Sequence, residues 1–97
     1  MAIASLSTHV LDTGAGRPAA GVEVQLSARG ELIASAQTGA DGRAQLGGEL
    51  APGVYGLAFL PPSTFFRRVE LEIELTEGHY HVPLIVSPYS CASYRGS

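Results

Sequence analysis

The sequence predicts an all-β fold, a β-sandwich of about seven or eight short strands. Apolar residues recur at every second position in several stretches, which is the period of a strand, and the period of an amphipathic helix is nearly absent. Segments rich in Gly, Pro or Asp separate these stretches. With 97 residues, 45% of them hydrophobic, the chain has the length of one domain with a thin core, and we expect residues 1–97 to form that domain.

The first half of the chain contains three expected strands. Residues 5–12 place Leu6 and Val10 on one face, with Ser5, Ser7 and His9 on the other. Residues 21–29 and 31–38 each alternate between apolar and more polar positions. Gly30 lies between these two runs, and the pattern therefore predicts a hairpin.

The second half adds three more expected strands. Residues 53–60 are largely apolar on both faces. Residues 69–76 alternate strictly, with glutamates on the polar face; stacked carboxylates of this kind are typical of a solubilising outer surface, so we assign them no chemistry. The run "HYHVPLIVSPY" (79–89) reads as a strand whose apolar face carries Tyr80 and Val82, which leaves His79 and His81 on the opposite face.

The connections between the expected strands are marked by turn residues. They are "DTGAGRPAAG", "TGADGR", "GGELAPG" and "LPPST". None of them resembles an interdomain linker, and the chain shows no internal repeat.

The charge balance argues against nucleic acid as a partner, and the distribution of apolar residues argues against a membrane. Six basic residues, all of them Arg, face nine acidic residues, and no positive cluster suited to phosphates is present. No apolar run is long enough for a membrane helix. The N-terminus lacks the basic and apolar regions of a secretory signal, and the single Cys91 has no partner for an internal disulfide. We therefore expect a cytoplasmic protein.

Few polar side chains are available for chemistry. They are the three histidines, Arg43, the hydroxyls of Ser7, Tyr94 and Ser97, and the terminal carboxylate. Imidazole, with an ordinary pKa of about 6.5, is the only one of these side chains that accepts and returns a proton near neutral pH. A guanidinium stays charged and holds an oxyanion or a carbonyl. Together such groups activate a water against an amide-like carbon.

Other interpretations of the histidines remain open at this point. Three histidines are enough for a catalytic zinc site with one open position, although His9 lies some seventy residues from the other two. The histidines are also typical of a wetted sheet face with no function. Nucleophilic catalysis and nucleotide binding are less supported, because no serine elbow, no His near Cys91 and no Gly-rich phosphate loop is visible.

Four segments in order resemble the 5-hydroxyisourate hydrolases, a transthyretin-like family of urate breakdown. They are "STHVLDTGAGRPAAGV" (7–22), "TGADGR" (38–43), "HYHVPLIVSPY" (79–89) and the terminal "YRGS" (94–97). Together these segments span nearly the whole chain. The combination of "HYHVPL" with the terminal tetrapeptide is far more specific than any single short motif.

The resemblance implies a transthyretin-like sandwich that assembles as a homotetramer, a dimer of dimers, with active sites in the channel between dimers. It implies neither a metal nor an organic cofactor. Position by position, it implies catalytic roles for His9, Arg43 and His81, and substrate-binding roles for Tyr94 and Ser97. It also selects His81 over His79, a choice that alternation alone leaves open.

The chain departs from the family pattern after residue 59. Members usually carry a short helix after the fifth strand, but only "LPPST" separates Phe59 from Phe65 here, and we expect the helix to be missing. A second function also stays open, that of a non-catalytic transthyretin-like carrier of a small molecule. A carrier of apolar ligands has no need for two imidazoles and a guanidinium in its channel, and this disfavours the carrier function.

Overall fold

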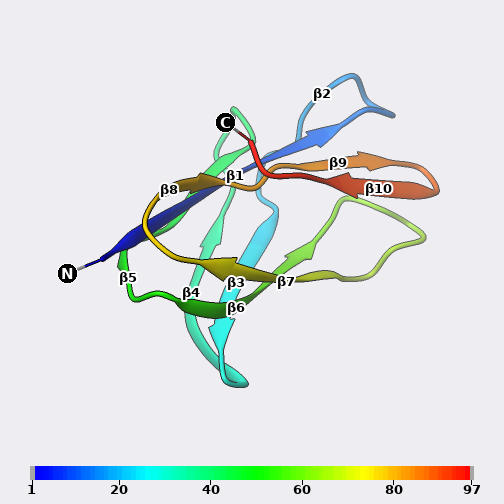
Figure 1. Ribbon diagram of the computed structural model, residues 1–97. Coiled ribbons are helices and arrows are strands. Elements are labelled where there is room, and N and C mark those ends of the chain that lie inside the picture. Colours follow the sequence, from blue (N-terminus) through cyan, green and yellow to red (C-terminus); the bar gives the residue numbers. More distant parts are fainter. Residues whose placement is uncertain (1, 97) are drawn as a thin grey trace.

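The computed structural model describes residues 2–96 and confirms the predicted all-β sandwich. Two sheets form two layers (Figure 1). The six-stranded sheet comprises β1 (Ala4–Asp12), β2 (Arg17–Pro18), β5 (Arg43–Leu50), β8 (Gly78–His81), β9 (Leu84–Ser87) and β10 (Ser90–Ser93). The four-stranded sheet comprises β3 (Glu23–Ala28), β4 (Glu31–Gln37), β6 (Gly53–Leu60) and β7 (Val69–Leu75), in the order β4-β3-β6-β7.

The core lies between the two sheets and is built from the apolar faces predicted by alternation. Leu6 and Val10 of β1 are fully buried, and Leu26, Leu57 and Phe59 cover them from the other sheet with no exposed surface of their own. Since side chains alternate along a strand, burying these residues turns Ser5, Ser7 and His9 to the outer face of the six-stranded sheet.

Strand β1 is the centre of the six-stranded sheet. It pairs antiparallel with β5 and β2, and parallel with β8 along its first half and β9 along its second half. Strands from four other parts of the chain therefore lie beside β1. This arrangement places segments that are distant in sequence within reach of its outward side chains.

The last predicted strand is divided in the structure. We expected one strand over residues 79–89, but β8 ends at His81 and β9 begins at Leu84. Pro83, between them, has no N–H to donate to a ladder, which explains the break. The face assignment is nevertheless confirmed, because Tyr80, Val82 and Leu84 are all buried.

The reading of "GGELAPG" as a turn was wrong in its first half, because Gly47 and Gly48 lie inside β5. The pairing of β5 with β1 shifts register between Ala4 and Leu6 and again between Leu6 and Ser7. Glycines favour such irregular pairing, so here they mark bulged pairing within the strand.

The connection between β6 and β7 contains no helix. Residues 61–68 form an irregular segment in which the Ser63 hydroxyl accepts hydrogen bonds from the backbone N–H groups of Phe65 and Phe66 at 3.0 and 2.9 Å. This agrees with the expected loss of the helix between Phe59 and Phe65. Nowhere in residues 2–96 does a helix have the length and apolar character needed to cross a membrane.

Candidate active site

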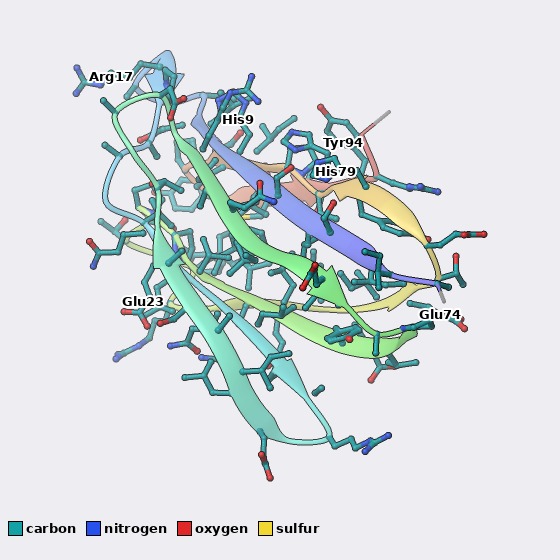
Figure 2. The ribbon with its side chains drawn as sticks, turned by 90° about the vertical axis from the view of Figure 1, so that its left-hand side faces the viewer. His9, Arg17, Glu23, Glu74, His79 and Tyr94 are labelled. Carbon is teal, nitrogen blue, oxygen red and sulfur yellow. The ribbon has the colours of Figure 1, made fainter. Side chains whose placement is uncertain are left out.

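Strand pairing brings the three predicted catalytic residues onto one face. His9 of β1 lies opposite Arg43 of β5, and Ser7, two residues earlier, lies opposite His81 of β8. Neighbouring strands are about 4.8 Å apart, so side chains on these three strands meet on the outer surface of the sheet. Figure 2 shows His9 and His79 projecting from this outer side, away from the four-stranded sheet.

A shallow, open pocket lies on this face. Its lining includes His81, Arg43, Ser7, Asp41 and Gln45. His9 is not among the lining residues, but it lies next to the pocket through its pairing with Arg43 and its contact with Asp41. The pocket thus combines an imidazole, a guanidinium and a hydroxyl.

The turn between β4 and β5 fixes both His9 and Arg43. Gly42 has a φ of +79°, and a Cβ there would lie 2.5 Å from the Val10 carbonyl oxygen and 3.2 Å from Cδ2 of His9. Glycine is therefore required at this position for the turn to lie against β1. The Val10 N–H donates to the Gly42 carbonyl at 2.8 Å and holds the turn in place.

The same turn determines the tautomer of His9. Nε2 of His9 lies 2.8 Å from the backbone carbonyl oxygen of Asp41. A carbonyl oxygen only accepts hydrogen bonds, so Nε2 carries the proton, and a neutral His9 keeps its lone pair on Nδ1. Nδ1 is therefore the nitrogen of His9 that is able to accept a proton.

Arg43 is exposed and only loosely paired. Its Nε lies 4.0 Å from a carboxylate oxygen of Asp41, and the side chain is 59% accessible. An exposed pair at this distance contributes little stability. The guanidinium is therefore available to an anionic or carbonyl-bearing ligand in the pocket.

The surroundings of His81 perturb its imidazole. Its Nδ1 lies 2.8 Å from Oγ of Ser7, and its Nε2 makes no hydrogen bond within residues 2–96. Partial burial lowers the pKa of His81 below its ordinary value, and the charge of Arg43 lowers it further, as does the cationic form of His9 or His79. His81 is therefore neutral, and able to act as a base, at neutral pH.

The C-terminal segment packs against His81. The Gly96 N–H donates to the His81 carbonyl at 2.6 Å, and a Cβ on Gly96 would lie only 2.8 Å from Cδ2 of the imidazole. The guanidinium of Arg95 lies over the ring of Tyr80 at 4.2 Å, a cation–π contact that anchors the segment. The tail therefore reaches the ring of His81.

The structure separates Tyr94 from the pocket that holds His81 and Arg43. Tyr94 is exposed, and in Figure 2 it lies near His79. It lines a different hollow, between β7 and the C-terminal segment, together with Tyr80 and Arg95. Ser97, the other predicted substrate-binding residue, lies outside the described residues.

No role was predicted from the sequence for Ser5 or for His79. Nδ1 of His79 lies 2.6 Å from Oγ of Ser5, and Nε2 of His79 lies 2.9 Å from Oγ of Ser7. The sequence shows that Ser5 and Ser7 share one face of their strand and that His79 and His81 share one face of theirs. The register that places β8 beside β1 is not visible in the sequence.

The zinc interpretation finds no ligand set in the described part of the chain. Within residues 2–96, no three or more His, Cys, Asp or Glu side chains converge in a way that suits a metal ion. The arrangement is instead suited to water activation. Two imidazoles, each with one ring nitrogen that makes no hydrogen bond among the described residues, lie beside an exposed and loosely paired guanidinium.

Comparison with known proteins shows which family the chain belongs to. A family model described as the HIUase/Transthyretin family matches residues 6–96. The chain belongs to the HIUase/Transthyretin family. This confirms the resemblance inferred from the four sequence segments.

Full-length relatives in the HIUase/Transthyretin family include proteins that are named as enzymes. The 5-hydroxyisourate hydrolase of Caulobacter vibrioides is 38% identical over 115 residues, which cover 98% of this chain and 100% of that protein. The 5-hydroxyisourate hydrolase of Pseudomonas aeruginosa is 40% identical, covering 95% of this chain and 90% of that protein. The solved structure of Klebsiella pneumoniae 5-hydroxyisourate hydrolase has a TM-score of 0.87 at 35% identity, with both chains fully covered.

Proposed function

We propose that this chain hydrolyses 5-hydroxyisourate to 2-oxo-4-hydroxy-4-carboxy-5-ureidoimidazoline in urate degradation. The observation that carries the proposal is the convergence of His9, Arg43 and His81 on adjacent positions of β1, β5 and β8. Full-length similarity to named 5-hydroxyisourate hydrolases supports the substrate and the reaction.

In this mechanism, His9 and His81 position a water and remove its proton. The nitrogens available to them are Nδ1 of His9 and Nε2 of His81. The water oxygen attacks the ring carbonyl beside N1 of the substrate. Arg43 binds the anionic substrate and stabilises the oxyanion of the tetrahedral intermediate, and collapse of that intermediate opens the ring.

The proposal includes a homotetramer, a dimer of dimers, with the pocket in the channel between dimers. The open pocket and the exposure of Arg43 within one chain support it, because a second chain would enclose the substrate and exclude water. Tyr94 and Ser97 complete the substrate site in this assembly. The lone Cys91 suits the reducing cytoplasm in which we place the protein.

The function is tested by adding the purified chain to 5-hydroxyisourate that urate oxidase generates in a cuvette. We expect the ultraviolet band of the substrate to disappear faster than it does spontaneously, over many equivalents of substrate per chain and equally fast after treatment with a chelator. A carrier without chemistry would at most change the band by one equivalent per site. Such a stoichiometric change, or activity lost to the chelator, would contradict the proposal.

A further inference from the structure

Four outward side chains of β1 and β8 form a continuous chain of hydrogen-bonding atoms. Oγ of Ser5 lies 2.6 Å from Nδ1 of His79, Nε2 of His79 lies 2.9 Å from Oγ of Ser7, and Oγ of Ser7 lies 2.8 Å from Nδ1 of His81. The parallel register of the two strands, Ser5 beside His79 and Ser7 beside His81, produces this order. The chain of atoms runs from the exposed His79 to the pocket.

The Ser7 hydroxyl couples the two imidazoles, because it has one proton and lies between two ring nitrogens. If Ser7 donates to Nε2 of His79, then Nδ1 of His81 must carry the proton and donate to Ser7. In that arrangement a neutral His81 has its lone pair on Nε2 and acts as a base. If Ser7 donates to His81 instead, every donor reverses, and Nε2 of His81 carries a proton and acts as an acid.

Given the proposed hydrolase function, on which this inference rests, we propose that Ser7 and His79 form a proton relay that lets His81 act first as base and then as acid. In the resting state the relay holds the proton of His81 on Nδ1. Arg43 lines the same pocket as His81, and its positive charge favours a lone pair over an N–H on the free Nε2.

The relay accounts for every proton in the two steps. In the first step, a water proton moves to Nε2 of His81 as the water oxygen bonds to the carbonyl carbon. The Nδ1 proton of His81 then passes to Ser7, and the Ser7 proton passes to Nε2 of His79, which becomes an imidazolium. In the second step, the C–N bond breaks and Nε2–H of His81 protonates the leaving nitrogen. The extra proton returns from His79 through Ser7 to Nδ1.

The surroundings of the two rings favour the cationic form on His79 and the neutral form on His81. His79 is exposed, so its cationic form is hydrated, whereas partial burial disfavours the cationic form of His81. Charge on His79 further lowers the pKa of His81, so the two rings are not readily cationic at the same time. One extra proton shared by the two rings is therefore favoured over two extra protons.

The relay is tested in the full chain by kinetics of Ser7→Ala, Ser7→Thr and His79→Ala, with Ser35→Ala as the matched control on the exposed surface of β4. We expect Ser7→Ala and His79→Ala to lose about 10-fold or more in kcat with little change in KM. Ser7→Thr, which keeps a hydroxyl, should retain most of the activity. Added imidazole should restore His79→Ala, where Ser7 is still present, and should leave Ser7→Ala slow.

The readout that a merely structural role would not move is the tautomer of His81, measured by ¹⁵N NMR of the imidazoles. We expect the proton on Nδ1 in the unmodified chain and a shift toward Nε2–H in Ser7→Ala. An unchanged His81 tautomer in Ser7→Ala would overturn the relay, whatever the rates. An active chain whose Ser7→Ala and His79→Ala variants keep the full rate would also overturn it and would leave the hydrolase function standing. An inactive chain would instead refute that function.

Discussion

At the scale of single residues, His81 is held on two sides. Oγ of Ser7 contacts its Nδ1, and Gly96 lies against Cδ2 on the opposite part of the ring. The free Nε2 is thereby fixed in direction. Proton transfer depends on such placement, because an error of about 1 Å in position costs catalysis about a hundredfold.

The pKa of His81 makes a prediction about pH. Burial first, and then the charge of Arg43, lower this pKa below its ordinary value of 6.5. The base is neutral above its lowered pKa, so kcat/KM should fall only as the pH drops through a midpoint below 6.5. In Arg43→Gln the midpoint should rise toward 6.5, because the charge that lowers this pKa most after burial is removed.

The lowered pKa of His81 also makes the free energy of unfolding depend on pH, in the same direction as the activity. Between the lowered pKa and 6.5, the unfolded chain binds more protons at this position than the folded chain does. The contribution of His81 to stability is therefore complete above pH 6.5 and is lost as the pH falls toward the lowered pKa. A pH profile of kcat/KM with its midpoint at or above 6.5 in the unmodified chain would refute the assignment of His81 as a neutral base.

Gly96 makes a second prediction at this scale. In Gly96→Ala the new Cβ would lie 2.8 Å from the His81 ring, so either the ring or the tail must move. We expect kcat to fall about tenfold or more, with the free energy of unfolding changed by less than about 0.5 kcal/mol. Gly48→Ala in β5 is the matched control, since its Cβ meets nothing within 4 Å. Equal turnover by the two variants would show that Gly96 does not position His81.

The sequence reached only part of the site at this scale. Alternation placed His9, His79 and His81 on outward faces, but it gave no reason to separate His81 from His79. The two rings differ through contacts made by distant segments: Gly96 covers His81, and Arg43 shares its pocket. Such contacts depend on strand order and register, which local periodicity does not encode.

At the scale of elements, alternation predicted the faces of strands better than their ends. The hairpin around Gly30 was confirmed, and its turn also holds Arg29 at a φ of +53°. Pro83 divides the predicted strand because it has no N–H to donate to the ladder. The apolar alternation continues across Pro83, so the pattern alone did not indicate the break. Gly47 and Gly48 were taken for a turn because glycine marks bulged pairing as well as turns.

The connection between β4 and β5 depends on one buried hydroxyl. Oγ1 of Thr38 donates to the Ala19 carbonyl at 2.6 Å and accepts from the Val22 N–H at 2.9 Å, and the residue is 4% exposed. Thr38→Val would leave both backbone groups without these partners. We expect the free energy of unfolding to fall by about 1–3 kcal/mol, measured by urea denaturation.

The control for this prediction is Thr64→Val in the exposed segment between β6 and β7. That variant should stay within about 0.5 kcal/mol of the unmodified chain. Equal stability of Thr38→Val and Thr64→Val would mean that the Thr38 hydroxyl does not hold the β2–β3 connection to the turn before β5.

At the scale of the whole molecule, the fold class followed from composition and from the two-residue period of the apolar positions. Each strand's own sequence determines which of its faces is buried. The assembly is not encoded locally. It depends on which outer surfaces meet, and a tetramer remains a prediction here. We expect a solution mass four times that of the 10.1 kDa chain, measured by light scattering after size exclusion. A monomer with full activity would contradict the proposed enclosure of the pocket.

The most direct test of the central claim is the rate at which 5-hydroxyisourate disappears with the chain and with its His9→Ala, Arg43→Ala and His81→Ala variants. If the outer faces of β1, β5 and β8 form one hydrolytic site, each variant should lose about 100-fold or more in kcat/KM while remaining folded by circular dichroism. A folded variant of any of the three that consumed the substrate at the unmodified rate would contradict the account.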